Sequence, residues 1–188
     1  MALLARCVSL AALLGRYGVL MLLLSCAAPA AAQESAAALQ IKAAFVHKFA
    51  TYVQGEGTAF DDPSVPLVFG IAGSEQVYDF LAELVATQNA GMRSADVRRV
   101  DVPADLAGVH VLVVGSDAAE EADALLQQGV GRSMLTITDL PGPQPANSMI
   151  HFFVADDRVR FDIALEPATA AGLRLSSRLL QVARLVGD

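Results

Sequence analysis

The sequence predicts a single α/β domain with a mostly parallel sheet, flanked by helices and carrying an antiparallel hairpin near the C-terminus. Two observations support this fold class. Short apolar runs rich in β-branched residues alternate with segments of helical periodicity, as in βαβ units. Near the C-terminus, two strand-like runs follow one another with only a short turn between them, which is typical of a hairpin.

The domain is predicted to begin with a helix over residues 36–53. Its apolar residues recur at helical spacing, and the expected buried face consists of Ile41, Ala44, Phe45, Phe49, Tyr52 and Val53. Glycines and an Asp-Asp-Pro cluster end this helix. The apolar run 67–72 then predicts a buried strand. A second helix is expected to begin at Ser74 and to end between Asn89 and Gly91.

The middle of the chain predicts two strands and one helix. Residues 97–102 alternate valines with charged residues, which indicates a partly solvated strand, and Pro103 ends it. Residues 109–114 form the clearest buried strand, because they are almost uninterrupted apolar residues. Residues 117–128 predict an acidic helix with Ala118, Ala122, Leu125 and Leu126 facing inward.

The C-terminal part predicts a strand, a loop, the hairpin and a long helix. Residues 134–138 are strand-like, and three prolines within 141–145 require a loop. The hairpin pairs residues 149–154 with 158–165, whose second run alternates with Val159, Phe161, Ile163 and Leu165 on one face. The last helix is expected over 167–186, with Ala168, Ala171, Leu175, Leu179, Val182 and Val186 in one stripe.

The first 32 residues have the composition of a secretory signal peptide. They contain Arg6 and Arg16 but no acidic residue, and a short apolar core leads into a run of small residues. We expect cleavage between Ala32 and Gln33, which places the mature domain at residues 33–188. Export implies the periplasm of a Gram-negative cell or the cell exterior.

The same segment supports two alternatives. Leu22-Leu23-Leu24-Ser25-Cys26 matches a lipobox, so that residues 1–25 would be a lipoprotein signal and a lipidated Cys26 would anchor the domain facing the periplasm. A looser apolar segment from Val8 is long enough to remain as a membrane anchor.

The charge of the mature domain bears on its partners. The chain has 13 basic and 20 acidic residues, and loss of two leader arginines leaves 11 against 20, a formal charge of −9. This charge disfavours nucleic acid and anionic lipid as partners. Contact with a membrane is expected only through a partner or a lipidated Cys26. Both cysteines, Cys7 and Cys26, lie in the leader, so the mature domain has no thiol chemistry.

The motifs of catalysis and cofactor binding are not found in the sequence. The histidines His47, His110 and His151 have no metal-ligand spacing, and no serine lies in a nucleophile-elbow motif. The glycines complete neither a dinucleotide fingerprint nor a P-loop. We therefore expect a protein that is not an enzyme and binds no metal or cofactor.

Several stretches resemble the YfiR family of periplasmic proteins. The helix Ile41-Lys-Ala-Ala-Phe-Val-His-Lys-Phe-Ala-Thr-Tyr-Val53 and the C-terminal runs Val159-Arg-Phe-Asp-Ile-Ala-Leu165 and Ala171-Gly-Leu-Arg-Leu-Ser-Ser-Arg-Leu-Leu180 are similar to the family's terminal motifs. The run Val109-His-Val-Leu-Val-Val114 and the pair Met149-Ile150 resemble motifs between them. The resemblance spans nearly the whole mature chain, and the A-G-L-x-L-S-S-R-L-L run is its most specific part.

The resemblance implies a non-catalytic repressor. Such a protein binds the periplasmic domain of a membrane diguanylate cyclase, holds it inactive, and so lowers cyclic di-GMP and biofilm formation. The alternative from a different class is a periplasmic small-ligand binding or sensor protein that is not linked to a cyclase. A second copy of the chain is a further candidate partner. For binding the cyclase we single out His47 and Lys48 on the first helix, and Arg174 and Arg178, which the predicted last helix places one turn apart.

The chain departs from the family pattern at two places. Many relatives carry cysteines at the positions of Gly70 and Val109, where a disulfide would couple repression to redox state, and this chain has none there. The family's Gly-Gly before Met-Ile is Asn147-Ser148 here. A turn that needs a positive φ at this point therefore requires Asn147 to adopt it.

Overall fold

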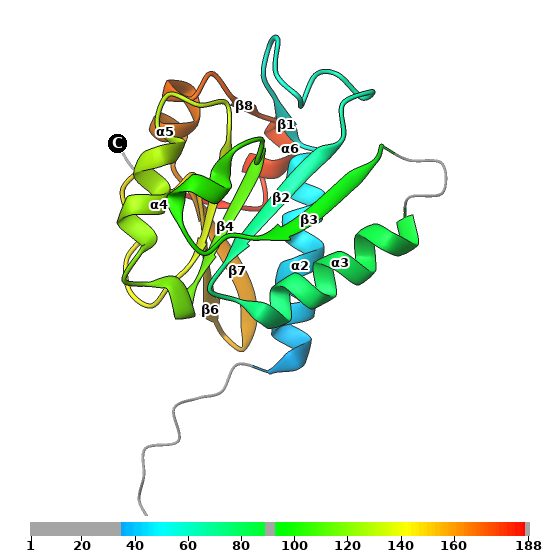
Figure 1. Cartoon of the computed structure of the whole chain (residues 1–188). Coiled ribbons are helices and arrows are strands. Elements are labelled where there is room, and N and C mark those ends of the chain that lie inside the picture. Colours follow the sequence, from blue (N-terminus) through cyan, green and yellow to red (C-terminus); the bar gives the residue numbers. More distant parts are fainter. Residues whose placement is uncertain (1–34, 89–92, 187–188) are drawn as a thin grey trace, which may run out of the picture. The chain divides into compact units, whose positions relative to one another are not determined.

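The computed structural model describes residues 35–88 and 93–186, and its centre is a seven-stranded sheet (Figure 1). The strand order is β3-β2-β4-β5-β6-β7-β9. Every neighbouring pair is parallel except β6 and β7, which form an antiparallel hairpin. The predicted fold class is thereby confirmed. The strands are β2 (Leu67–Ala72), β3 (Ala95–Arg99), β4 (Val111–Gly115), β5 (Leu135–Asp139), β6 (Ile150–Ala155), β7 (Arg158–Ile163) and β9 (Arg184–Leu185).

Helices cover the sheet, and a second, two-stranded sheet pairs β1 (Val53–Gln54) with β8 (Arg174–Leu175) in antiparallel fashion. The α-helices are α2 (Ala36–Ala50), α3 (Glu75–Gln88), α4 (Ala122–Gly129), α5 (Leu165–Ala170) and α6 (Ser177–Leu180), and the 3-10 turns are η1 (Pro103–Leu106) and η2 (Ser116–Ala118). The predicted signal peptide, its cleavage site and Cys26 lie outside the described residues.

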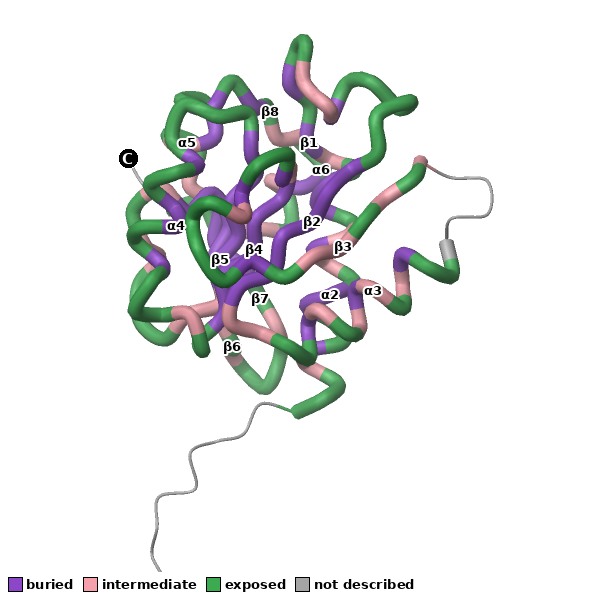
Figure 2. The backbone as a smooth tube through the Cα atoms, viewed as in Figure 1, coloured by how far each residue is buried: buried purple, intermediate pink, exposed green. Residues whose placement is uncertain are grey.

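The core consists of two hydrophobic clusters, and successive residues of β2 belong to one cluster or the other in turn. Phe69 belongs to the cluster that includes α2 and α3, whereas its neighbour Val68 belongs to the cluster that includes α4 and η1. Successive residues of a strand point to opposite faces, so the two clusters lie on the two sides of the sheet. Figure 2 shows the central strands as largely buried, whereas buried and exposed residues alternate along the helices.

The helix α2 differs from its prediction in length and in its buried face. It is capped by the Ser35 side chain and ends at Ala50, while Val53 has joined β1. Ile41, expected to be buried, is 48% exposed, whereas Lys42 is only 3% exposed. The Lys42 Nζ lies 2.6 Å from both carboxylate oxygens of Asp139 at the end of β5. This ion pair allows a charged side chain to occupy the face that packs on the sheet.

The predicted last helix over 167–186 is wrong. Gly172 has φ of +71°, a conformation that ends α5, and the chain then extends into β8. The Ser176 N–H donates to the Tyr52 carbonyl, which holds this segment against the end of α2 and β1. The apolar stripe of the prediction is also broken, since Val182 is 70% exposed.

The hairpin and the loop before it follow the prediction. Strands β6 and β7 pair across a two-residue turn, in which Asp156 and Asp157 have φ of 52° and 56°. These values suit a turn that matches the strand twist, and aspartate tolerates them. Asn147 has φ of 64°, so it adopts the positive φ that its position was expected to require.

Other predicted elements are present with shifted ends. The strand expected at 97–102 ends at Arg99, and the acidic helix expected from residue 117 begins at Ala122 after the turn η2. Leu165 starts α5 instead of ending the hairpin, and it is exposed. The short strands β1, β8 and β9 were not predicted.

Candidate interaction surface

The hairpin β6–β7 has one buried and one partly open face. On the buried face, the ring of Phe49 from α2 lies 4.8 Å from that of Phe161 and 5.8 Å from that of Phe152, centroid to centroid. Because side chains alternate along a strand, Phe153 and Arg160 point the other way. Phe153 is half-buried and Arg160 is exposed on that second face.

An arginine from the last strand covers part of the open face. Arg184 in β9 donates from Nε and one terminal nitrogen to the two oxygens of Asp162, at 2.7 and 2.6 Å. Its guanidinium carbon lies 4.4 Å from the ring centroid of Phe153. The hydrogen bonds that Arg184 donates to Asp162 raise the pKa of Arg184, so this group remains a cation. Asp162 thus fixes a charged, planar group over an aromatic ring.

Two further arginines give this face a positive charge. Arg158 and Arg160 are both exposed on β7, on the same side as Asp162 by strand alternation. Within the described ranges, neither of them forms an ion pair or a side-chain hydrogen bond. We define Phe153, Arg158, Arg160, Asp162 and Arg184 as the hairpin face. It is a basic and aromatic surface on a chain that is acidic overall.

The residues that the sequence analysis selected lie elsewhere. Lys48 is exposed near the end of α2, and His47 beside it is half-buried, with its ring 6.2 Å from that of Phe69. Burial lowers the pKa of His47, so it is mostly neutral at neutral pH. Arg174 and Arg178 are exposed, but Arg174 belongs to β8 and Arg178 to α6. The expected spacing of one helical turn is therefore wrong.

The structure nevertheless brings the two selected chain regions together. Strand β1 follows α2 directly, and its residue Gln54 is the register partner of Arg174. The C-terminal end of α2 and the β8–α6 segment therefore lie side by side, as Figure 1 also shows. These contacts do not test partner binding, so the role of His47, Lys48, Arg174 and Arg178 in it stays a prediction.

The hairpin face was missed in the sequence, although one signal for it was present. The alternation of residues 158–163 that predicts an apolar side also places Arg158, Arg160 and Asp162 together on the other side. The pairing of Asp162 with Arg184 had no local signal, because it depends on β9 returning to the sheet edge.

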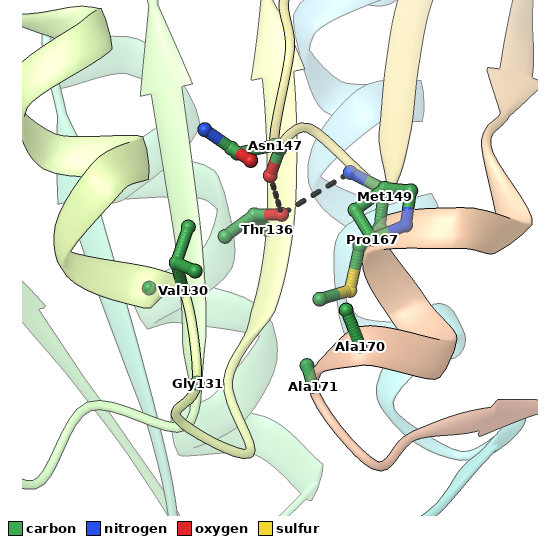
Figure 3. A pocket seen from close by; sticks show the side chains of 9 residues that line it. Val130, Gly131, Thr136, Asn147, Met149, Pro167, Ala170 and Ala171 are labelled. Atoms are coloured by element: carbon green, nitrogen blue, oxygen red, sulfur yellow. Dashed lines mark hydrogen bonds between the residues drawn. The ribbon is translucent and has the colours of Figure 1, made fainter.

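A small cavity lies between α4, β5 and α5 (Figure 3). Its volume is about 30 Å³, and apolar groups such as Val130, Met149 and Ala171 line it. The Thr136 hydroxyl, which also lies at its wall, already donates to the Asn147 carbonyl at 2.7 Å and accepts from the Met149 N–H at 3.1 Å. A space of this size holds about one water molecule, so this cavity does not accommodate a metabolite.

An open depression of about 560 Å³ lies between the loop 57–65 and His110. The Nδ1 atom of His110 accepts a hydrogen bond from the Val68 N–H at 3.0 Å, so this nitrogen is not available to a ligand. Burial, together with the charges of Arg93 and Arg98, lowers the pKa of His110. The ring is therefore a neutral structural contact between β2 and the start of β4.

The described part of the chain offers neither a metal cluster nor a membrane-spanning helix. Within residues 35–88 and 93–186, no cluster of three or more His, Cys, Asp or Glu side chains has a geometry that could hold a metal ion. None of the helices in these ranges combines the length and the apolar character needed to cross a bilayer.

Comparison with known proteins identifies the family. Residues 39–184 match the model of the family described as YfiR/HmsC-like. Curated proteins yield no match to the chain. The family match begins in α2 and ends in β9, so it includes the whole sheet and the hairpin face. It is consistent with a periplasmic regulator of cyclic di-GMP signalling. The chain belongs to the YfiR/HmsC-like family.

Proposed function

We propose that this protein is a periplasmic repressor that binds the periplasmic domain of a membrane diguanylate cyclase and lowers cyclic di-GMP, and with it biofilm formation. Family membership supports this function. The observation that carries it is the hairpin face, where exposed arginines and a half-buried phenylalanine stand on an acidic protein. Arginine and aromatic side chains are enriched where proteins bind one another.

The hairpin face selects a partner surface of acidic character. Arg158 and Arg160 supply cations without partners of their own in the described structure, so a facing carboxylate would gain a charge-assisted hydrogen bond. Arg184 differs from them because Asp162 already fixes its orientation. We infer that Arg184 and Phe153 form a rigid platform. Arg158 and Arg160 provide the electrostatic attraction and make the surface selective for a negatively charged partner.

Repression requires only a difference in affinity. A cyclase that exchanges between an inactive and an active conformation is held inactive by any protein that binds the inactive form more tightly. A tenfold preference corresponds to about 1.4 kcal/mol of differential binding free energy. No chemical step by the repressor is needed for this effect.

The location is part of the same proposal. Export by the leader, with cleavage between Ala32 and Gln33, would release residues 33–188 into the periplasm, where the sensory domain of the cyclase is found. A lipidated Cys26 would instead tether the same domain at the membrane surface. Either product leaves the hairpin face available to the cyclase.

A cellular measurement tests the function. Cyclic di-GMP is measured in a strain that lacks the gene, in the same strain carrying the gene in trans, and in one carrying a version without residues 1–32. We expect deletion to raise cyclic di-GMP and only the exported form to lower it again. An unchanged level after deletion, across several growth and envelope-stress conditions, would refute the repressor function and favour a search for small ligands.

The leader alternatives are separated by the same strains. Mass spectrometry of the exported protein distinguishes an N-terminus at Gln33 from one at a lipidated Cys26. Substitution of Cys26 by serine leaves repression unchanged if cleavage follows Ala32, and abolishes processing if the lipoprotein pathway operates.

A further inference from the structure

His151 lies on β6 with only 2% of its surface exposed, and both of its ring nitrogens have partners. Its Nδ1 lies 2.9 Å from the Thr138 hydroxyl oxygen on β5, and its Nε2 lies 3.3 Å from the Gly142 carbonyl in the proline-rich loop. The Thr138 hydroxyl lies 2.8 Å from that of Ser148, which donates to the Ile150 carbonyl at 2.9 Å. The histidine thus ends a chain of two hydroxyl groups.

When the His151 ring is neutral, one hydrogen bond between these groups cannot form. The Gly142 carbonyl can only accept, so Nε2 carries the hydrogen and the neutral Nδ1 must accept from Thr138. Ser148 then has one hydroxyl hydrogen for two acceptors, the Thr138 oxygen and the Ile150 carbonyl. Three short contacts therefore share two hydrogens, and one contact is always without a proton.

The protonated ring fits the same positions of the heavy atoms. With a hydrogen on Nδ1, His151 donates to Thr138, Thr138 donates to Ser148, and Ser148 donates to the Ile150 carbonyl. Each of the three contacts now has its own hydrogen, and the added proton comes from solvent. Only the hydroxyl groups of Thr138 and Ser148 need to rotate, so the protonated His151 is accommodated without rearrangement of the backbone.

Charged groups face the ring from three elements. Asp162 on β7 is its register partner across the hairpin, Asp139 ends β5, and the Lys42 ammonium on α2 is bound to Asp139. Burial lowers the pKa of His151, whereas the Gly142 carbonyl and the charges of Asp162 and Asp139 act in the opposite direction, and Lys42 adds to the lowering. The proton thus arrives at lower pH than for a solvated histidine, at a ring flanked by two carboxylates.

We propose that His151 is an acid-responsive residue whose protonation reverses the hydroxyl chain of Thr138 and Ser148, attracts the carboxylate of Asp162, and thereby loosens Arg184 on the hairpin face. Asp162 is shared, because it is opposite His151 in the hairpin and holds Arg184 by two hydrogen bonds. The platform over Phe153 then loses its fixed orientation. The consequence for cyclase binding rests on the proposed function, whereas the link between His151 and Arg184 does not.

The link is tested by NMR on the intact protein purified after export with its own leader. The Nε–H signal of Arg184 and the ring signals of His151 are followed between about pH 5 and 8, the range in which histidine charge changes. We expect both sets of signals to move with one midpoint. In His151→Asn, whose side-chain oxygen can still accept from Thr138, the movement of the Arg184 signal is lost.

Controls separate this link from general acid effects. His47→Gln removes a histidine that packs against Phe69, whose cluster lies on the other side of the sheet from the hairpin face, and leaves the Arg184 titration unchanged. Thr138→Val removes the acceptor for the protonated ring and shifts the His151 midpoint to lower pH, which provides a second test if His151→Asn does not fold. An Arg184 signal that does not titrate, or that titrates equally in His151→Asn, overturns the proposal.

Binding to the cyclase is measured separately. The affinity of the exported protein for the cyclase periplasmic domain is expected to fall by about fivefold or more at acid pH, a typical strength of coupling between sites, and to be independent of pH in His151→Asn. Failure to bind at any pH refutes the cyclase function but leaves the NMR result intact. Binding that weakens equally in both proteins overturns the regulatory role of His151.

Discussion

Gly70 and Val109 occupy adjoining positions in the core. A Cβ atom placed on Gly70 would lie 3.0 Å from Cγ1 of Val109 and 2.8 Å from Cγ2 of Val100. The valine side chains therefore fill the space that a side chain on Gly70 would take. The resemblance to the YfiR family implies that many relatives carry cysteines at these two positions. In a disulfide, the Cβ of one cysteine lies about 3 Å from the sulfur of the other, so the separation suits such a bond.

The double variant Gly70→Cys, Val109→Cys is expected to form a disulfide in the oxidising periplasm. The bond would close a loop of about 40 residues and stabilise the oxidised form over the reduced form by roughly 3–4 kcal/mol. Urea unfolding with and without a reductant measures this difference. Two free thiols in the folded, air-oxidised variant would contradict the proximity of the two positions.

The single variant Gly70→Ala has the opposite effect. Its new methyl group meets the Val100 side chain at 2.8 Å, closer than carbon atoms normally approach. We expect a loss of about 1–3 kcal/mol in the free energy of unfolding, as for other overpacked cores. A variant as stable as the parent would show that Val100 yields without strain.

The pair of Lys42 and Asp139 is expected to be essential for stability. Lys42→Met leaves the Asp139 carboxylate without its ammonium partner in a largely buried site. We expect a loss of about 2–4 kcal/mol, somewhat below the cost for a fully buried pair because Asp139 retains some contact with water. Urea unfolding provides the measurement.

The matched control for this prediction is Lys48→Met on the exposed side of the same helix. It should change stability by no more than about 0.5 kcal/mol. The double variant Lys42→Met, Asp139→Asn should recover part of the loss, because the unpaired charge is gone. Equal losses for Lys42→Met and Lys48→Met would rule out a structural role for the ion pair.

The lowered pKa of His110 predicts that the stability of the protein depends on pH. Its pKa is lowered in the folded state, so the unfolded chain takes up a proton first as the pH falls. The contribution of neutral His110 is therefore present above about pH 6.5 and is lost as the pH falls from there towards the folded-state pKa. Protonation of Nδ1 also removes the acceptor of the Val68 N–H.

Urea unfolding between about pH 7.5 and 5 measures this loss. In His110→Asn the side-chain oxygen can still accept from Val68 but does not titrate, so the decline in stability should be smaller. His47 and His151 also have lowered pKa values and leave a residual decline of the same sign. Identical pH profiles for the parent and His110→Asn would show that His110 contributes nothing to the decline in stability.

The strands of the central sheet were predictable because their sequence signals are local. Residues 67–72 and 109–114 are apolar runs that bury both faces of a parallel strand, and alternation identified β7. The positive φ of Asn147 was expected because the family motif has glycine there. Each of these features is determined by a few consecutive residues.

The C-terminal segment could not be predicted from its periodicity. Its apolar residues have helical spacing, but Gly172 ends the helix and β8 pairs with β1, which lies about 120 positions earlier. Lys42 was missed for a related reason. A charged residue is expected to face solvent unless its partner is known, and Asp139 is 97 positions away. Contacts over such distances are invisible in a local pattern.

The candidate surface was predictable only in part. Alternation in β7 places Arg158 and Arg160 together, while the orientation of Arg184 depends on Asp162 and on the return of the chain to the sheet edge. The four residues selected from the sequence remain predictions, although Arg174 and Arg178 do not share a helix.

The central claim is that the hairpin face binds the periplasmic domain of a diguanylate cyclase. Calorimetry of the exported protein with that domain tests it directly, using the double variant Arg158→Glu, Arg160→Glu. Arg132→Glu, at an exposed position between α4 and β5, is the control: it makes one such charge reversal, half the charge change of the double variant, away from the hairpin face. We predict that the parent and the control bind alike, and that the double variant binds at least about tenfold more weakly because its charges repel an acidic partner. Equal binding by all three proteins, or no binding by the folded parent, would contradict the account.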